Sequence, residues 1–190
     1  MSSSDVVLKT LMERRSCRKY EKRPVPHDVL EKIVEAGRHA PTAMNRQELI
    51  FYAIESPEVV QKIGMETHAI AAKAVTRLVD RMNQMDLTNA ITCDAQACIV
   101  ITVENNKDKL YFSELDTGLA VQNILIAASA LGLRCLPVGL AAGFNERGIL
   151  DIIGAKDEKM MLLINIGYPD PDYDKKFLPE KAITSVVHYV

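Results

Sequence analysis

The sequence contains no tryptophan, and aromatic residues make up only 5% of its 190 residues. Proteins that bind single-stranded nucleic acid stack bases on aromatic side chains, so this scarcity argues against that class. The formal net charge of −2 also provides no general attraction to nucleic acid or to anionic membranes. A positively charged site must therefore come from local clustering of basic residues.

Cysteine pairs, targeting signals and dinucleotide-binding motifs are missing as well. The four cysteines form no CxxC pair and the four histidines lack metal-ligand spacing, so we expect reduced thiols and no metal site. The sequence has no signal-peptide core and no apolar run long enough to span a bilayer, and no GxGxxG motif follows an apolar strand. These absences predict a cytoplasmic protein outside the membrane, without a dinucleotide-binding Rossmann unit.

The chain does contain long helical patterns alternating with few strands, which predict an α+β fold in a single domain, residues 1–190. Ser4 is expected to cap the first helix and Gly132 to follow the end of a later one. The run at 97–103 is apolar throughout, which is typical of a strand buried on both faces. The expected helices cover 5–14, 27–39, 56–84 (one or two helices, with Gly64 as the candidate break), 113–131 and 145–153, and the expected strands cover 49–54, 97–103, 134–140 and 160–168.

An arginine-rich segment follows the first helix and places Arg14, Arg15 and Arg18 around Ser16. Guanidinium groups and a hydroxyl suit a phosphate, which they can hold by charge-assisted hydrogen bonds. The alternative is that these cations complement the helix dipole and stay solvated. Mutual repulsion among the arginines favours the phosphate interpretation somewhat, since a bound anion would relieve it.

A polar loop, APTAMNRQ at residues 40–47, follows the second helix. Pro41 is expected to end that helix. Asn45 and Gln47 each offer a donor and an acceptor, which suits a heterocycle with alternating carbonyl and N–H groups, whereas a phosphate would need only donors. The alternative is a helix stop followed by an ordinary turn.

Two further segments are candidates for ligand contact. In LPVGL, Pro137 fixes the backbone and Gly139 lets it approach a flat ligand, although a strand ending in a turn would explain the motif equally well. In the tail, Lys175 and Lys176 are either anion ligands or a solvated charge pair. Asp116 lies near the start of an expected helix, where capping is the simpler interpretation.

Taken in order, RRSCRKY, APTAMNRQ, DTGLAVQNILIAASALGL, LPVGL, INIGYPD and the lysine-containing tail ending in VVHYV resemble the FMN-dependent nitroreductase family. The resemblance covers both ends of the chain and most of its second half, and it is weakest at residues 56–92. It implies an α+β fold with a central, mostly antiparallel sheet flanked by helices. It also implies an intertwined homodimer with FMN at the subunit interface, and a tail, residues 169–190, that reaches the partner subunit.

The resemblance further implies which residues contact FMN. The arginine-rich segment would hold the phosphate and reach the pyrimidine edge, the polar loop would meet the ring from the partner subunit, and residues 137–139 would approach flavin N5. No catalytic side chain is expected, because the flavin carries the chemistry. The expected cofactor-binding residues are Arg14, Arg15, Ser16, Arg18, Pro41, Thr42, Ala43, Asn45, Gln47, Pro137, Val138, Gly139, Lys175 and Lys176.

Two departures from the family pattern stand out. Phe177 occupies a position where the family's tail often has an arginine on the FMN phosphate, so a phosphate contact from the tail would have to come from Lys175 or Lys176. Glu48 and Leu49 occupy positions where many members have Pro-Trp, beside the flavin ring.

The activity implied by the resemblance is an NAD(P)H-dependent oxidoreductase with ping-pong kinetics, which reduces a small electrophilic acceptor such as a nitroaromatic or a quinone. Three alternatives stay open: another flavoenzyme on the same scaffold (reductive dehalogenation or flavin cleavage) with a lid at residues 56–92, a flavin-storage protein, and an anion-binding module without flavin. The sequence decides neither the acceptor nor the choice between NADH and NADPH.

Overall fold

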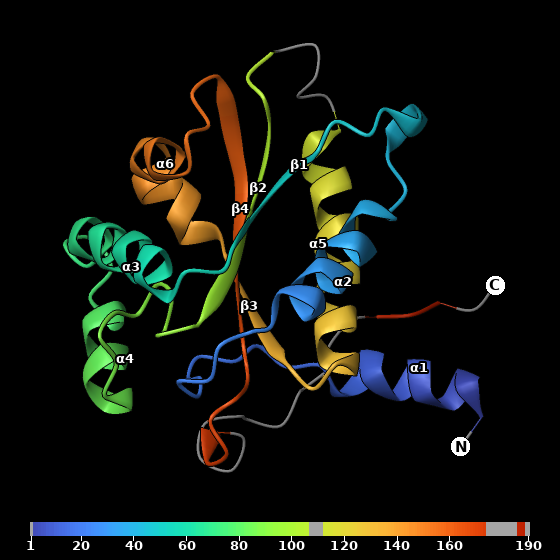
Figure 1. Ribbon diagram of the computed structural model, residues 1–190, viewed down its shortest axis with the longest axis horizontal. Coiled ribbons are helices and arrows are strands. Elements are labelled where there is room, and N and C mark those ends of the chain that lie inside the picture. Colours follow the sequence, from blue (N-terminus) through green and yellow to red (C-terminus); the bar gives the residue numbers. More distant parts are fainter. Residues whose placement is uncertain (1, 107–111, 174–185, 189–190) are drawn as a thin grey trace.

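The computed structural model describes residues 2–106, 112–173 and 186–188 and has a four-stranded sheet at its centre (Figure 1). The strands follow the order β1-β2-β4-β3, and every neighbouring pair is antiparallel. The predicted α+β class with an antiparallel sheet is therefore confirmed. The strand bounds are β1 Ile50–Ile54, β2 Ala97–Glu104, β3 Arg134–Val138 and β4 Glu158–Gly167.

Helices cover both faces of this sheet (Figure 1). On one face lie α2 (His27–Arg38) and α5 (Ser113–Ala130), and on the other lie α3 (Pro57–Ala71) and α6 (Gly139–Ile153). None of the described helices is both long and apolar enough to cross a membrane.

Strand β2 separates two apolar cores. Ile99 and Ile101 belong to the core under α2 and α5, whereas Cys98 and Val100 belong to the core under α3 and α6, because successive residues of a strand point to opposite faces. Every residue of β2 except Glu104 is buried. The predicted burial on both faces is therefore confirmed.

The N-terminal helix α1 (Ser3–Glu13) has no buried residue. The N-cap of α1 is Ser2, so the prediction of Ser4 as the cap was wrong. The Ser2 hydroxyl accepts a hydrogen bond from the N–H of Asp5, and the Asp5 carboxylate accepts one from the N–H of Ser2. An apolar helix face left open in this way is typical of a surface that packs against another molecule. The exposed apolar side chains of α1 are Val6, Val7, Leu8, Leu11 and Met12.

Residues 56–92 form two helices, α3 and α4 (Arg77–Met85), rather than one. Gly64 does not break α3. It lies inside that helix, where an added Cβ would come within 2.3 Å of the Thr92 hydroxyl. Glycine is therefore needed for the close approach of α3 to the buried polar group at Asn89 and Thr92.

The segment 134–140 ends differently from the prediction. The strand β3 stops at Val138, and Gly139 is already the first residue of α6, so no tight turn intervenes. The helix expected at 145–153 is the second part of α6, and Asn145, with φ −146° and ψ 36°, is a kink within it. Gly132 does follow the end of α5 with a φ of +79°, as predicted.

Candidate functional site

The arginine-rich segment lies directly beside β3. The Ser16 backbone pairs with Cys135 in a parallel bridge, and the N–H of Cys17 donates to the carbonyl of Cys135 at 3.1 Å. Arg134, the first residue of β3, donates from Nη1 to the carbonyl of Glu13, the last residue of α1, at 3.4 Å. The structure thus joins two of the predicted groups. We call residues 14–18 together with residues 137–139 the arginine corner.

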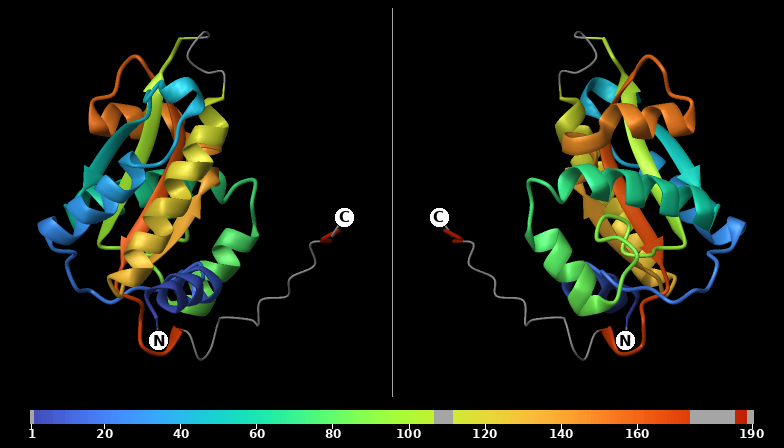
Figure 2. Two further views of the ribbon diagram at one scale, coloured as in Figure 1. Left: turned by 90° about the vertical axis from the view of Figure 1, so that its right-hand side faces the viewer. Right: turned by 90° about the vertical axis from the view of Figure 1, so that its left-hand side faces the viewer.

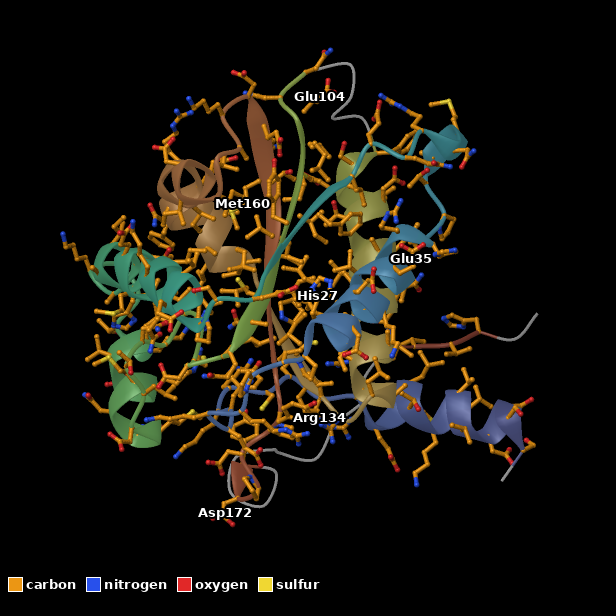
Figure 3. All side chains as sticks on the ribbon, viewed as in Figure 1. His27, Glu35, Glu104, Arg134, Met160 and Asp172 are labelled. Carbon is orange, nitrogen blue, oxygen red and sulfur yellow. The ribbon has the colours of Figure 1, made fainter. Side chains whose placement is uncertain are left out.

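Residues 14–18 of the arginine corner lie at the end of the sheet where β3 begins, which Figure 3 marks by Arg134. In that view Arg134 and Asp172 lie at this end, whereas Glu104, the last residue of β2, lies at the other. The chain after β4 returns to the corner, since Pro169 pairs with Tyr20 and the N–H of Asp170 donates to the carbonyl of Lys19 at 3.1 Å.

The arginines of the corner differ in what they contact. Arg15 donates from Nη1 to the carbonyls of Met12 at 2.9 Å and Arg14 at 3.1 Å, so its guanidinium caps the carboxyl end of α1. The helix-dipole interpretation therefore holds for Arg15. Arg14 is the C-cap residue of α1 and is half-buried, as is Ser16.

The clearest indication of a ligand-binding site in the arginine corner comes from Arg18. Its Nε is buried and has no hydrogen-bond partner in the described part of the chain. The neighbouring Tyr173 is 1% exposed. Burial raises the pKa of the Tyr173 hydroxyl, and a hydrogen bond and the positive charge of Arg18 oppose that rise. A buried guanidinium N–H without an acceptor is costly, and an anionic ligand would remove that cost.

Gly139 offers open backbone four residues along the chain from Cys135, the residue that pairs with Ser16. A Cβ added there would meet no atom within 4 Å, and the residue is exposed. Because Gly139 begins α6, its N–H lies among the first backbone donors of that helix, which have no partner inside the helix. Pro137 of β3 pairs with Ile164 of β4. Because β3 is an edge strand, the missing N–H of the proline is tolerated there. Val138 is buried. A flat ligand with an anionic arm fits these groups.

The polar loop, residues 40–47, lies near the other end of α5 (Figure 1). The N–H of Ala43 donates to the carboxylate of Asp116, in the first turn of α5, at 2.9 Å. An α-helix rises about 1.5 Å per residue, so the 18 residues of α5 span about 27 Å. One chain therefore does not bring the polar loop to its own arginine corner.

The polar loop adopts an uncommon backbone conformation. Met44, Asn45 and Gln47 have φ values of 53°, 52° and 53°, in the left-handed region that non-glycine residues rarely adopt. The Nε2 of Gln47 donates to Oδ1 of Asn45 at 2.8 Å, and its backbone N–H donates to the Thr42 hydroxyl at 3.1 Å. Pro41, Asn45 and Gln47 are exposed. Their polar groups thus face outward, available to a ligand or a neighbouring chain.

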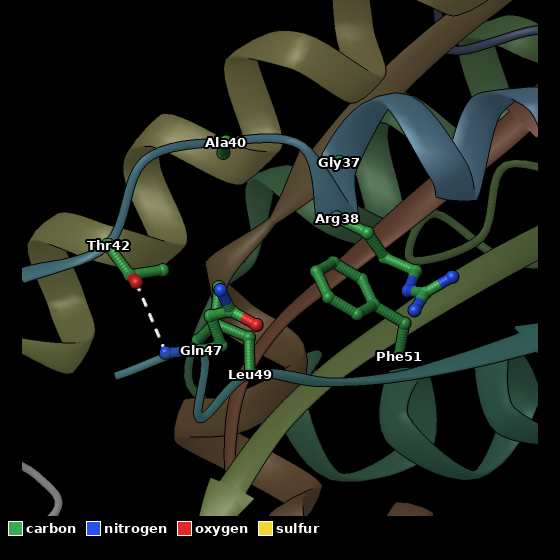
Figure 4. Close-up of a pocket in the computed structure, with 7 residues that line it drawn as sticks. All are labelled: Gly37, Arg38, Ala40, Thr42, Gln47, Leu49 and Phe51. Carbon is green, nitrogen blue, oxygen red and sulfur yellow. Dashed lines mark hydrogen bonds between the residues drawn. The ribbon is translucent and has the colours of Figure 1, made fainter. Parts of the chain in front are cut away.

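A cavity of about 170 Å³ lies behind the polar loop (Figure 4). Thr42 and Gln47 line one end of it, and Arg38 and Phe51 lie toward the other. Leu49 also lines the cavity, between these two pairs. Many members of the family have the bulkier tryptophan at this position. The remaining lining residues are Gly37 and Ala40.

One residue with a place in the site was missed from the sequence. Asp116 was taken for a helix cap, but it is a buried side chain that holds the polar loop. Lys175 and Lys176 lie outside the described residues, so their predicted contacts stay predictions.

Comparison with known proteins agrees with this geometry. Residues 11–168 match the model of the nitroreductase family. A candidate NADH dehydrogenase/NAD(P)H nitroreductase of Methanothermobacter thermautotrophicus is 30% identical over 70% of the chain, which spans 61% of that relative. The FMN reductase [NAD(P)H] of Bacillus subtilis is 25% identical, with 97% of this chain and 74% of the relative aligned. Iodotyrosine deiodinase 1 of Rattus norvegicus is 25% identical, over 92% of this chain and 67% of the relative.

The solved structures agree on the fold. A nitroreductase with bound FMN from Desulfitobacterium hafniense superposes with a TM-score of 0.81, over 100% of both chains, at 21% identity. The family match covers most of the sequence and includes the arginine corner, the polar loop and all four strands. The chain belongs to the nitroreductase family.

Proposed function

We propose that this protein is an FMN-dependent oxidoreductase that passes reducing equivalents from NADH or NADPH to a small electrophilic acceptor, such as a nitroaromatic or a quinone, in a ping-pong reaction. The observation that carries the proposal is the arginine corner, where a buried guanidinium N–H has no partner among the described residues and the strand that pairs with Ser16 runs on to an open glycine at a helix start. When bound, FMN supplies the hydride chemistry that the side chains lack. The names of the relatives support both the cofactor and the donor.

In this proposal the arginine corner binds and orients the cofactor. Arg14 and Ser16 donate to the FMN phosphate, and Arg18 stabilises the negative charge that reduction places at the pyrimidine end of the ring. The N–H of Gly139 faces flavin N5. No side chain is required as a general acid, because water can protonate the product.

We further propose a homodimer in which the partner's polar loop completes each site. The support is that the polar loop and the arginine corner lie at opposite ends of α5 within one chain. A large apolar surface is also open in the single chain, which favours association. Gly118 on α5 has no atom within 4 Å of an added Cβ, so another helix can approach it closely. The exposed apolar residues of α5 and its ends are Phe112, Leu115, Leu119 and Leu131.

The tail belongs to the same dimer proposal. Residues 169–173 stay on their own chain at the arginine corner. Residues 186–188, drawn red near the C-terminus, stand clear of the body of the molecule (Figure 2), and Val186 and Val187 are 78% and 65% exposed. We propose that this apolar segment packs on the partner subunit. The four free, buried cysteines suit a reducing compartment such as the cytoplasm.

The decisive experiment is anaerobic titration of the purified protein with NADH and with NADPH, followed by nitroaromatics and quinones. The expected protein is yellow, loses its flavin absorbance on adding one nicotinamide, and recovers it on adding an acceptor. A flavin spectrum that neither nicotinamide bleaches would indicate a storage protein. A colourless protein that takes up no FMN would indicate an anion-binding module and end the proposal.

Reductive dehalogenation is the second candidate function. It is favoured by the similarity to iodotyrosine deiodinase 1 across 92% of this chain. The lid expected for that activity would lie at residues 56–92, which form α3 and α4. Halide release from a halogenated phenol, measured beside nitroaromatic and quinone reduction on the same preparation, separates the two activities.

A further inference from the structure

A cavity beside the arginine corner is lined by arginines from two separate segments. The carboxyl end of α1 meets the carboxyl end of α5 (Figure 1), and residues of both ends line a cavity of about 210 Å³. Arg14, at the end of α1, and Arg134, at the start of β3, both line it and are half-buried. We call this space the Arg14 cavity. It brings together two cations that are far apart in the sequence.

Backbone contacts hold the two arginines side by side. Ser16 and Cys135 pair in a parallel bridge, so the arginines stand just before the paired residues on neighbouring stretches of chain, which lie about 4.8 Å apart in a sheet. The Nη1 of Arg134 donates to the carbonyl of Glu13, the residue before Arg14, at 3.4 Å. Burial raises the pKa of the Cys135 thiol, and the positive charge of Arg14 opposes that rise. The cavity, the bridge and the hydrogen bond thus place both arginines at one site.

Helix capping accounts for only part of this arrangement. At the end of α5, the carbonyl of Ser129 accepts from the backbone N–H of Gly132 at 3.2 Å and needs no arginine. At the end of α1, Arg15 already caps the helix through the carbonyl of Met12 at 2.9 Å. The bond from Arg134 to α1 is longer than the range of about 2.7–3.2 Å that is usual for such hydrogen bonds. Capping alone therefore does not explain why two further guanidinium groups gather at this cavity.

The carboxylates nearby leave the Arg14 cavity with a positive charge. Of the described residues that line it, Glu13 alone carries a carboxylate, and that group is exposed and lies 3.8 Å from the ammonium of Lys9. Asp170 and Asp172 lie at the same end of the sheet, but neither lines the cavity. Asp170 lines a separate hollow with Lys19, and its carboxylate accepts from the N–H of Asp172 at 2.9 Å. Two arginines facing one partly compensated carboxylate favour an anion in the cavity.

We infer that Arg14 and Arg134 are the two sides of a site for a phosphate monoester. Guanidinium groups match the oxygens of a phosphate in pairs, and the hydroxyl of Ser129, which also lines the cavity, is a further donor. The inference rests on the proposed function, in which two molecules carry such a group: FMN, as its 5′-phosphate, and NADPH, as its 2′-phosphate. Arg134 is thus a binding residue from outside the arginine-rich segment. It determines either how tightly the cofactor binds or which nicotinamide is the donor.

The test compares Arg134→Gln with the parent, with Arg134→Lys as the charge-conserving variant. Arg147→Gln is the matched control, because Arg147 also donates from Nη1 to a backbone carbonyl at 3.4 Å, but on α6, outside the cavity. Two ratios are measured on each full-length protein. The first compares the dissociation constants of FMN and of riboflavin, which lacks the phosphate, from flavin fluorescence on dilution of protein loaded with either. The second compares kcat/KM for NADPH with kcat/KM for NADH.

The outcomes distinguish the two sources of the phosphate. If the cavity holds the FMN phosphate, Arg134→Gln weakens FMN by about tenfold relative to riboflavin, as expected for loss of a charge-assisted hydrogen bond. If it holds the 2′-phosphate of NADPH, both flavins bind as in the parent, and the NADPH-to-NADH ratio falls by about tenfold. Equal weakening of both flavins at an unchanged nicotinamide ratio would show that Arg134 only supports the end of α1, and would overturn the inference. So would two ratios that match those of the parent and of Arg147→Gln.

The lysine variant keeps the test open if Arg134→Gln does not fold. Lysine retains the charge but cannot make the paired contact of a guanidinium, so one of the two ratios should change by about threefold in Arg134→Lys. Ratios equal to those of the parent would then contradict the inference.

Failure of the proposed function gives a different result. If the parent is purified without flavin and takes up none, the cavity is tested with inorganic phosphate alone, through the melting temperature. Phosphate should then raise the melting temperature of the parent and of Arg147→Gln more than that of Arg134→Gln. That result would keep the anion site while the function fails. An equal rise in all three proteins, or no rise in the parent, would overturn the site as well.

Discussion

The arginine corner and the polar loop are both rich in hydrogen-bonding groups, but they are built in opposite ways. The corner is half-buried and joined to β3 by backbone pairing at Ser16 and Cys135. The polar loop is largely exposed, with three residues in the left-handed region, and the N–H of Ala43 donates to Asp116 of α5. The corner is a site in one chain, whereas the loop projects polar groups outward.

This difference explains what each region can do. A half-buried guanidinium with an unpaired N–H can bind an anion strongly, because little water competes for it. An exposed amide contributes less, since each hydrogen bond it makes replaces one to water. We therefore expect the corner to determine how tightly the cofactor binds, and the loop to adjust that affinity from the neighbouring subunit.

The largest effect is expected at Arg18. Arg18→Ala removes a charged donor from the corner and should weaken FMN by about 10- to 100-fold, since hydrogen bonds to charged groups contribute about 1.5–3 kcal/mol. The reduction potential of the remaining bound flavin should fall, because the cation near the pyrimidine end is lost. Fluorescence titration and a redox dye measure the two quantities. Retention of FMN at an unchanged potential would refute the role given to Arg18.

A smaller effect is expected at Asp116, which positions the polar loop from α5. Asp116→Ala leaves the N–H of Ala43 without its acceptor, and the loop should lose its left-handed conformation more readily. We expect the binding free energy of FMN to weaken by about 1 kcal/mol, which corresponds to roughly fivefold lower affinity. Asp116→Asn keeps an oxygen acceptor and should restore most of the affinity. If both variants weaken FMN equally, the carboxylate acts by its charge and not by holding the loop.

Most of the fold could be predicted because its signals are local. The hydrophobic periodicity located every strand, and the apolar run at 97–103 indicated correctly a strand buried on both faces. The errors lie where tertiary contacts override local preference. Gly64 looked like a helix break but is required by close packing against Thr92, and Gly139 looked like a turn but starts a helix.

The candidate site was less accessible from the sequence. Without the family resemblance, nothing in the sequence would assign Ser16 and Pro137 to the same ligand. The β-bridge that joins their segments forms only in the folded sheet. Asp116 was misread because a carboxylate in the first turn of a helix is usually a local feature.

Asn45 provides a finer test of the comparison between the two regions. Asn45→Ala removes an exposed amide that accepts from Gln47 at 2.8 Å, and FMN affinity should fall by about two- to fivefold, much less than for Arg18→Ala. The dimer should stay intact in sedimentation experiments, because the loop contributes polar groups and not the apolar surface. An Asn45→Ala protein that binds FMN as tightly as the parent would remove the loop from the cofactor site.

The smallest effect is expected at His27, which lies outside both regions and serves as a reference. Its Nδ1 contacts the carboxylate of Glu55 at 2.5 Å, and the hydrogen bond with Glu55 raises the pKa of His27 above 6.5. A group with a raised pKa in the folded protein stabilises it fully below the unfolded value and loses that contribution as pH rises through the folded value. The free energy of unfolding should therefore decline more steeply in the parent than in His27→Gln as the pH rises above about 6.5, the ordinary pKa of histidine. FMN affinity should not differ between the two proteins, and a difference there would mean that the corner and the loop are not independent of the rest of the surface.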